Sequence, residues 1–411
     1  MTKIAVLGAY PLDPTRLSGV EVAIVYVQRE LLKQPDVTLH VISCHSSLTE
    51  PKTVQDGRLT VTYLPRGSHG RITWHRQEVA ALRRVLDAFC PDMVHAHGSG
   101  LYAGAALGSG YPAVVTVHGI AAQEARLAYN DPATSWGDRL RGLLDSAYER
   151  WVIGRAEHLI VISPYVEQVF ARVFRGTCYL VENACEERFF DLRREPVPGR
   201  LLFAGPVIPR KGVLLLLQAL ERVRREMPEA HVRIAGSLNA DPDYARACQA
   251  LVAERGMEEA VAFLGHVSQE QVLEEYRRCA VFVLPSFQET APMVIEQAMA
   301  AGVPSVATRV GGVPWMLEDG VTGLTLPAPG ANELRGERGQ TRGGLSLAST
   351  VDELTRAILR LLQNPAQARS MGERARIEAE ARFRPEAVAR RTLGVYRSVL
   401  STDPNRRFRM I

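Results

Sequence analysis

The stretch QETAPMVIEQAMAAG, residues 288–302, follows the apolar run VFVLPS and brings a carboxylate, a polar turn and the start of a helix together. This order predicts a strand, a tight turn and a helix, which is the repeating unit of a parallel α/β sheet. The N-terminus of such a helix carries unpaired N–H groups and a partial positive charge, which suit a diphosphate. Glu289 lies just before the helix and can accept hydrogen bonds from sugar hydroxyls. The segment therefore predicts a nucleotide-sugar site.

The rest of the chain repeats the same alternation of short apolar strands and amphipathic helices. The expected strands are residues 4–8, 37–44, 59–65, 92–97, 113–119 and 158–163 in the first half, and 201–207, 231–237, 261–267, 281–286 and 304–309 in the second. No short tandem repeat is present, so the halves share an architecture rather than a sequence. The fold class is therefore predicted to be α/β, with two parallel sheets covered by helices.

The length of 411 residues fits two domains, each able to bury its own core. The stretch RREPVPGR, residues 193–200, interrupts the alternation as a linker would. We expect an N-terminal domain over residues 1–190 and a C-terminal domain over residues 198–380. The Gly- and Arg-rich stretch at residues 327–346 is predicted to be a surface loop.

The composition, with 46% hydrophobic and 23% charged residues, is that of a globular protein without a bilayer-spanning run. The chain begins directly with a predicted strand, and its six cysteines form no CxxC pair, so we expect a cytoplasmic protein without disulfides. His95 and His97 have no evident third ligand, so we expect no metal site.

The net charge of +4 and the pI near 8.7 are mild, and no dense basic stripe predicts nucleic-acid binding. This charge suits an anionic donor. It also suits peripheral contact with the inner face of an anionic membrane, although such a balance is more commonly a solvated surface.

Residues 288–302 resemble the Glu, seven residues, Glu signature of the retaining glycosyltransferases of family 4, the glycosyl transferases group 1. That resemblance implies the GT-B fold, with two Rossmann-like domains whose parallel sheets face an interdomain cleft. Glu289 takes the first position, by the donor sugar. Gln297 takes the second, which in the family is the Glu that holds the ribose hydroxyls. An amide there costs on the order of 1 kcal/mol, or about tenfold in affinity.

Further motifs in the N-terminal half carry the same resemblance. SGVEVAIVYVQREL, from residue 18, resembles the family's glycine loop, in which Gly19 lets the backbone approach the diphosphate. VTVHGI, from residue 115, places His118 at the end of a strand, where the family's histidine reaches the donor sugar. Taken alone, Gly19 is better explained by a helix cap and His118 by a loop histidine. The resemblance also implies that a helix over about 385–400 packs back on the first domain.

In the C-terminal half, LLFAGPVIPRKGV, from residue 201, resembles the strand, loop and Lys-Gly that open the donor domain. The resemblance implies that Lys211 neutralises part of the pyrophosphate charge. Pro206 stands where the family usually has an Arg, and Arg210 is a candidate to supply the missing positive charge. FLGHVSQEQ, from residue 263, resembles the loop that lines the base. The remaining donor-binding candidates are Gly205, Val267, Thr290, Ala291, Pro292 and Met293.

The resemblance implies a retaining, metal-independent hexosyltransferase that needs no cofactor. It would move a sugar from a UDP- or GDP-sugar to a hydroxyl of a glycan, a lipid-linked acceptor or a small molecule. His118, Lys211 and Glu289 are the predicted catalytic residues. Two alternatives stay open: a weakened nucleotide-sugar-binding GT-B scaffold subunit, and another GT-B enzyme such as a sugar-nucleotide epimerase.

Overall fold

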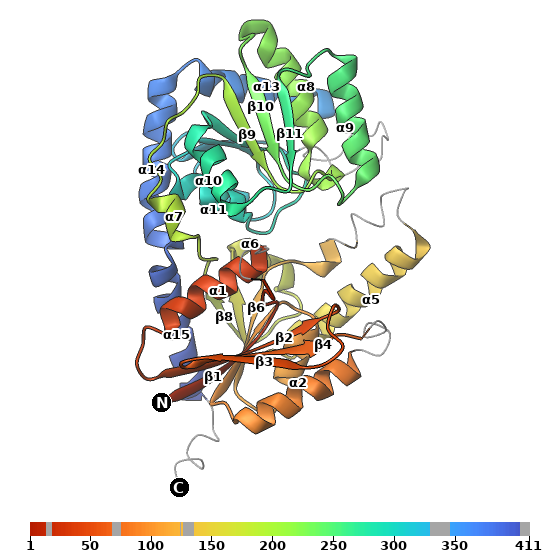
Figure 1. The fold of residues 1–411 in the computed structure, drawn as a ribbon, viewed down its shortest axis with the longest axis vertical. Coiled ribbons are helices and arrows are strands. Elements are labelled where there is room, and N and C mark those ends of the chain that lie inside the picture. Colours follow the sequence, from red (N-terminus) through yellow and green to blue (C-terminus); the bar gives the residue numbers. More distant parts are fainter. Residues whose placement is uncertain (14–18, 68–74, 124, 126–134, 329–345, 403–411) are drawn as a thin grey trace. The chain divides into compact units, whose positions relative to one another are not determined.

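The computed structural model describes residues 1–13, 19–67, 75–123, 125, 135–328 and 346–402 (Figure 1). The chain divides into two compact units, Met1–Ala184 with Pro385–Ile411, and Cys185–Arg384. The stretch predicted to be a linker belongs to the second unit, because the N–H groups of Glu195 and Val197 each donate to a carbonyl, of Arg277 and Arg278 respectively, at 2.9 Å. The division therefore comes before residues 193–200. Most of the predicted surface loop, residues 329–345, lies outside the described residues.

The first unit contains an eight-stranded sheet in the order β3-β4-β2-β1-β5-β6-β7-β8. All neighbouring strands are parallel except β3, which pairs antiparallel with β4. The strands are β1 Thr2–Leu7, β2 Val37–His45, β3 Lys52–Asp56, β4 Leu59–Pro65, β5 Met93–His97, β6 Ala113–Val117, β7 His158–Val161 and β8 Thr177–Leu180. The helices are α1 Gly19–Leu31, α2 Arg76–Phe89, α3 Leu101–Leu107, α5 Trp136–Ile153, α6 Pro164–Phe170 and α15 Pro385–Thr402.

Helix α15 joins the first unit although it comes from the far end of the chain. It packs against α1, and the two helices lie side by side in Figure 1, blue beside red. Val388, Val395 and Val399 of α15 are buried in the same apolar cluster as β1 and β2. Burial of these side chains removes apolar surface from water and so stabilises the unit.

The second unit contains a six-stranded parallel sheet in the order β11-β10-β9-β12-β13-β14. The strands are β9 Arg200–Ala204, β10 His231–Ala235, β11 Val261–Gly265, β12 Val281–Leu284, β13 Ser305–Thr308 and β14 Gly323–Leu326. The helices are α7 Glu187–Phe190, η1 Pro209–Lys211, α8 Val213–Glu226, α9 Pro242–Glu254, α10 Gln269–Arg278, α11 Met293–Ala300, α12 Val313–Met316, α13 Leu347–Leu362 and α14 Pro365–Phe383.

In sequence order within the unit this arrangement is 3-2-1-4-5-6, the strand order of a Rossmann fold, in which β9 and β12 flank the point where the order reverses. The predicted class of two α/β units with parallel sheets is confirmed, with β3 as the antiparallel exception.

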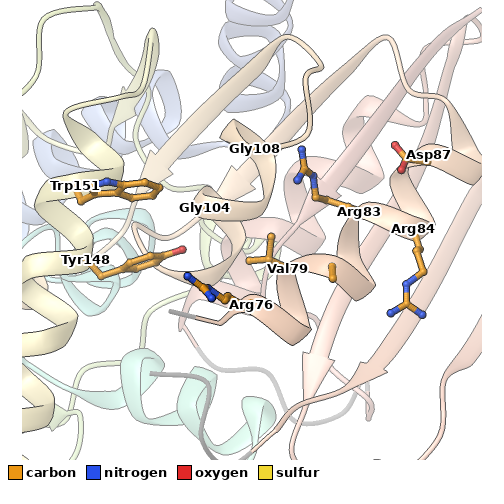
Figure 2. Close-up of a pocket in the computed structure, with 10 residues that line it drawn as sticks. Arg76, Val79, Arg83, Arg84, Asp87, Gly104, Gly108, Tyr148 and Trp151 are labelled. Carbon is orange, nitrogen blue, oxygen red and sulfur yellow. The ribbon is translucent and has the colours of Figure 1, made fainter. Parts of the chain in front are cut away.

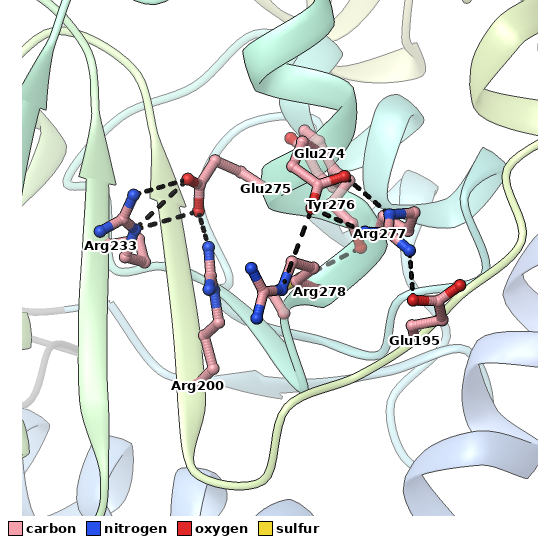
Figure 3. Close-up of polar contacts among 9 residues, drawn as sticks. Glu195, Arg200, Arg233, Glu274, Glu275, Tyr276, Arg277 and Arg278 are labelled. Atoms are coloured by element: carbon pink, nitrogen blue, oxygen red, sulfur yellow. Dashed lines mark hydrogen bonds and ion pairs between the residues drawn. The ribbon is translucent and has the colours of Figure 1, made fainter.

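A buried ion network ties α10 to the sheet of the second unit (Figure 3). The Glu275 carboxylate accepts from Arg200 Nη2 at 2.7 Å and from Arg233 Nη2 at 3.0 Å. Arg200 and Glu275 are buried, so each charge depends on the other for the stabilisation that water would otherwise supply. Around the same helix, Arg277 pairs with Glu274 and Glu195.

Candidate active site

The predicted residues of the second unit gather where β9 and β12 end. Gly205 follows β9, and the chain then reaches Lys211 in the short η1 turn; Ser286 and Glu289 follow β12. Since β9 and β12 are neighbours at the reversal of strand order, their carboxyl ends open on the edge where α/β sheets bind ligands.

The centre of this cluster is a buried ion pair. Lys211 Nζ donates to Glu289 Oε1 at 2.6 Å, and Ser286 Oγ donates to the same oxygen at 2.6 Å. Lys211 is 8% exposed and Glu289 is 4% exposed, so water does little to stabilise either charge. Burial lowers the pKa of Lys211, and the Arg210 charge acts in the same direction, while the Glu289 carboxylate opposes the shift.

Arg210 holds the two loops of the cluster against each other. Its Nη1 donates to the Gln288 carbonyl at 3.1 Å and lies 3.8 Å from Glu289 Oε2, and its own carbonyl accepts from Phe287 N at 2.8 Å. Gly212 has φ 68°, and a Cβ there would lie 2.1 Å from the Pro285 carbonyl oxygen. The close approach that sets Lys211 against Glu289 therefore requires glycine at this position.

The other donor-binding candidates surround this cluster or lie apart from it. Gly205 has φ 142° and faces the Lys211 side chain, since a Cβ built on it would lie 3.8 Å from Lys211 Cε. Thr290, Ala291 and Pro292 form the turn before α11, and Met293 is its first residue. Val267 packs against the core of the unit. Gly19, the first residue of α1, is exposed in the first unit.

Gln297, the residue in place of the second acid, lies on α11 and is half-buried. The Tyr276 hydroxyl lies 2.9 Å from the Val294 carbonyl oxygen and 3.3 Å from Gln297 Oε1. The amide carbonyl can therefore accept from Tyr276, and a carboxylate in its place could do the same.

In the first unit, His118 follows β6 and forms part of a hydrogen-bonded chain. His118 Nδ1 lies 3.1 Å from Asn183 Oδ1, and His118 Nε2 lies 2.9 Å from His97 Nδ1. The rings of His97 and His118 stack, with centroids 5.2 Å apart. His95 contacts the Tyr396 hydroxyl and the Thr116 hydroxyl, each at 2.7 Å.

The partners fix the protons of this chain. Asn183 Oδ1 can only accept, so His118 Nδ1 carries the proton and the neutral ring presents Nε2 as an acceptor to His97 Nδ1–H. Burial lowers the pKa of His118 to about 4. Burial lowers the pKa of His97 well below its usual range, and the neighbouring His95 and His118 add to the shift. Both ring nitrogens of His118 are therefore engaged, so any sugar contact of its side chain must replace one of these hydrogen bonds.

Three residues of these clusters were not predicted as site residues. Ser286 donates to Glu289, His97 contacts His118, and Asn183 fixes its tautomer. A signal for His97 exists in the sheet register, which pairs His97 with Thr116, two residues before His118. Within the described part of the chain, no group of three or more His, Cys, Asp or Glu side chains is arranged to hold a metal ion. The helices of that part include none that is long and apolar enough to cross a membrane.

Comparison with known families matches both halves of the chain. Residues 17–186 match the family described as Glycosyltransferase Family 4, and residues 198–364 match the one described as Glycosyl transferases group 1.

Among curated proteins, a D-inositol 3-phosphate glycosyltransferase of Kribbella flavida is 26% identical over 226 residues, which are 54% of this chain and 48% of the relative. Matches to the same enzyme of two Streptomyces species span 31% and 29% of those relatives, so the chain spans about half or less of these proteins' length. An alpha-D-kanosaminyltransferase of Streptomyces kanamyceticus is 24% identical over 351 residues, 80% of this chain and 82% of that enzyme.

Among solved structures, sucrose-phosphate synthase from Thermosynechococcus elongatus superposes with a TM-score of 0.75 at 22% identity, covering 98% of this chain and 100% of that one. HepE of Anabaena in complex with UDP-glucose gives a TM-score of 0.69 at 17% identity, covering 97% and 100%. These likenesses show that the two units have the GT-B fold.

Proposed function

Because the chain belongs to glycosyltransferase family 4, within the glycosyl transferases group 1, we propose that it moves a sugar from a nucleoside-diphosphate sugar to an acceptor hydroxyl. The acceptor would be a glycan, a lipid-linked glycan or a small molecule. UDP is our first choice of nucleotide and GDP the second, since HepE, which shares the fold, was solved with UDP and UDP-glucose.

The observation that carries this proposal is the buried Lys211–Glu289 pair at the carboxyl edge of the second sheet. An ammonium group has three N–H donors, so Lys211 can hold Glu289 and a phosphate oxygen at once. Arg210 adds a second cation, 3.8 Å from Glu289. Two fixed cations suit the negative charge that grows on a departing diphosphate.

We further propose that transfer proceeds with retention and without a metal. The bond from the anomeric carbon to the diphosphate oxygen breaks, the bond to the acceptor oxygen forms on the same face, and the acceptor's proton passes to the departing diphosphate. In this scheme Lys211 and Arg210 stabilise the leaving group. Glu289 and His118 would position the donor sugar, and these roles stay predictions.

The first test is a thermal-shift series of the purified chain against UDP, GDP, ADP and their common sugar conjugates, with and without EDTA. A ligand that binds only the folded state raises the midpoint of unfolding. We expect a shift with one nucleotide, unchanged by EDTA. Lys211→Met should reduce this shift. Arg246→Ala should not, because Arg246 is exposed on α9, where it pairs with Asp243.

Product analysis then separates the alternatives. A product whose anomeric configuration matches the donor, read by NMR, supports a retaining transferase, whereas inversion contradicts it. A shift without turnover would favour the scaffold subunit, and interconversion of nucleotide sugars without an acceptor would favour an epimerase. The absence of a shift with any nucleotide would contradict the donor site.

The cytoplasmic location and the membrane contact also stay proposals. The mildly basic charge is what supports contact with an anionic surface. Flotation of the chain with vesicles of phosphatidylglycerol, set against vesicles of phosphatidylcholine, tests the contact. Equal recovery with both lipids, or none with either, would contradict it.

A further inference from the structure

The first unit contains a large cavity that the proposed donor chemistry does not use. It lies among α2, α3 and α5 and has a volume of about 1170 Å³ (Figure 2). It is lined by Arg76, Val79, Ala80, Arg83, Arg84, Asp87, Gly104, Gly108, Tyr148 and Trp151. The cavity is open to solvent along α2, where Arg76, Ala80, Arg83, Arg84 and Asp87 are exposed, so a ligand would be covered on one side only.

The α2 wall of the cavity is cationic. Arg76, Arg83 and Arg84 all line it, and Asp87 is the single carboxylate among the lining residues. Within the described residues, the side chains of these three arginines make no hydrogen bond or ion pair. Figure 2 shows Arg76 extending toward Tyr148 and Arg83 lying near Gly108. The wall therefore presents guanidinium groups whose N–H donors are available to a ligand.

The α5 wall is aromatic. The rings of Tyr148 and Trp151 stack, with centroids 5.7 Å apart and planes 17° from parallel (Figure 2). Tyr148 is 8% exposed and fits against α3 because Gly104 has no side chain, since a Cβ there would lie 2.0 Å from Tyr148 Oη. Trp151 is 38% exposed, and the Arg155 guanidinium lies over its ring, 4.3 Å from the centroid. The indole is a large and rigid apolar surface, and a sugar ring that packed on it would take the place of Arg155.

We propose that this cavity binds a phosphorylated carbohydrate, with the phosphate held by Arg76 and Arg83 and the sugar ring packed against Trp151. A guanidinium group matches the oxygens of a phosphate bidentately, which a neutral sugar cannot exploit. Free phosphate would leave the aromatic wall unused. The site belongs to the first unit alone, and its occupancy requires no transfer reaction.

The test is isothermal titration calorimetry of the full chain with glucose 6-phosphate, inorganic phosphate and glucose. We expect saturable binding of glucose 6-phosphate, weaker binding of phosphate and none of glucose. Equal affinity for phosphate and glucose 6-phosphate would overturn the carbohydrate part of the proposal. Absence of binding of both would overturn the site.

Matched variants locate the binding. Arg76→Ala/Arg83→Ala should weaken glucose 6-phosphate binding about tenfold or more, because charge-assisted bonds are lost. Arg172→Ala should not, since Arg172 is an exposed arginine of the same unit outside the cavity. Ala80→Phe, which narrows the cavity and keeps every charge, should also weaken binding. Unchanged affinity in both cavity variants would overturn the proposal.

Two further variants separate this site from the donor cluster. Trp151→Ala should weaken binding of glucose 6-phosphate and leave that of phosphate unchanged; an equal loss for both ligands would overturn the aromatic role. Lys211→Met should keep glucose 6-phosphate binding while its nucleotide shift is reduced. If Lys211→Met instead abolished glucose 6-phosphate binding, the ligand would bind the second unit and the proposal would fail. A chain that binds no nucleotide but still binds glucose 6-phosphate would contradict only the proposed transferase.

Discussion

In the first unit His97 and His118 lie at the carboxyl edge of a parallel sheet as neutral rings, whereas in the second unit Lys211 and Glu289 lie at the corresponding edge as an ion pair. The histidine chain avoids the desolvation of a charge, but its protonation state then depends on pH. The ion pair keeps its charges, but each depends on its partner. Polar groups at equivalent places in two similar sheets are thus buried by different physical means.

The largest expected effect comes from breaking the ion pair. Glu289→Ala leaves the buried Lys211 ammonium without its carboxylate and should destabilise the second unit by about 3–5 kcal/mol. Urea denaturation measures this change. Lys211→Met/Glu289→Leu removes both charges and should cost less than Glu289→Ala alone. Additive losses in the double variant would show that the pair is not coupled.

A control for the donor role of this pair is available in the same unit. Glu275→Ala removes the carboxylate shared by Arg200 and Arg233 and should also be strongly destabilising (Figure 3). In the folded protein, however, this variant should still bind the nucleotide. If Glu289→Ala and Glu275→Ala both lost nucleotide binding, the loss in Glu289→Ala would reflect destabilisation of the second unit and not a contact with the nucleotide.

The next effect is the response of the histidine chain to acid. Burial lowers the pKa of His95 from 6.5 to about 3. Below pH 6.5, His95 therefore binds a proton in the unfolded chain but stays neutral in the folded chain. Stability is therefore complete above pH 6.5 and falls as the pH is lowered toward 3, by up to about 1.4 kcal/mol per pH unit for each such histidine. The free energy of unfolding in urea, measured across this range, should show the slope.

His95→Asn should lower the slope of the free energy of unfolding against pH by the amount that corresponds to one proton. The absolute stability of the variant does not affect this comparison. His266→Asn is the control, since His266 is exposed and belongs to the second unit. If His95→Asn and the unmodified chain have the same slope, the buried histidine is not the source of the acid response.

A smaller effect is expected from uncoupling His118. His97→Phe removes the donor to His118 Nε2 but keeps a stacking ring, and should lower kcat/KM about tenfold, the value of roughly one hydrogen bond. Steady-state kinetics with the donor found by thermal shift provides the measurement. Full activity in His97→Phe together with impaired His118→Ala would show that His118 works without this contact.

The smallest effect concerns the amide on α11. Gln297→Glu would replace a neutral hydrogen bond to the ribose by a charged one, and should tighten nucleotide binding by at most about tenfold. The new carboxylate can still accept a hydrogen bond from the Tyr276 hydroxyl. Gln249→Glu serves as the matched control, since it adds the same charge at an exposed position of α9. Equal affinities of Gln297→Glu and the unmodified chain would remove Gln297 from the donor site.

The sequence predicted the apolar strands well, because a strand buried on both faces is a short run of apolar residues between turns. Strands β3, KTVQD, and β8, TCYL, were not predicted, since none of their residues is buried and each pairs with a single neighbour, β4 or β7. The stretch at residues 193–200, which resembles a linker, belongs to the second unit for a related reason. Its prolines resemble a linker, but its backbone groups pair with Arg277 and Arg278, far along the chain.

The candidate site was foreseeable where a motif is local. Lys211 and Glu289 each occur in a strand, turn and helix context, and the structure brings them within 2.6 Å. The partners of His118 were not foreseeable in this way, because Asn183 and His97 lie 65 and 21 positions away. Side-chain contacts between such distant positions follow from sheet order, which a single sequence does not state.

The return of α15 to the first unit has a consequence for synthesis. Residues from Pro385 onward complete the first unit, and Tyr396 contacts His95 at 2.7 Å, yet they leave the ribosome only after the whole second unit. The nascent first unit must therefore wait, with the apolar surface of α1 uncovered, while all 200 residues of Cys185–Arg384 are translated. A nonsense mutation just before Pro385 would spare the second unit's whole sequence and still leave the first unit without its final helix.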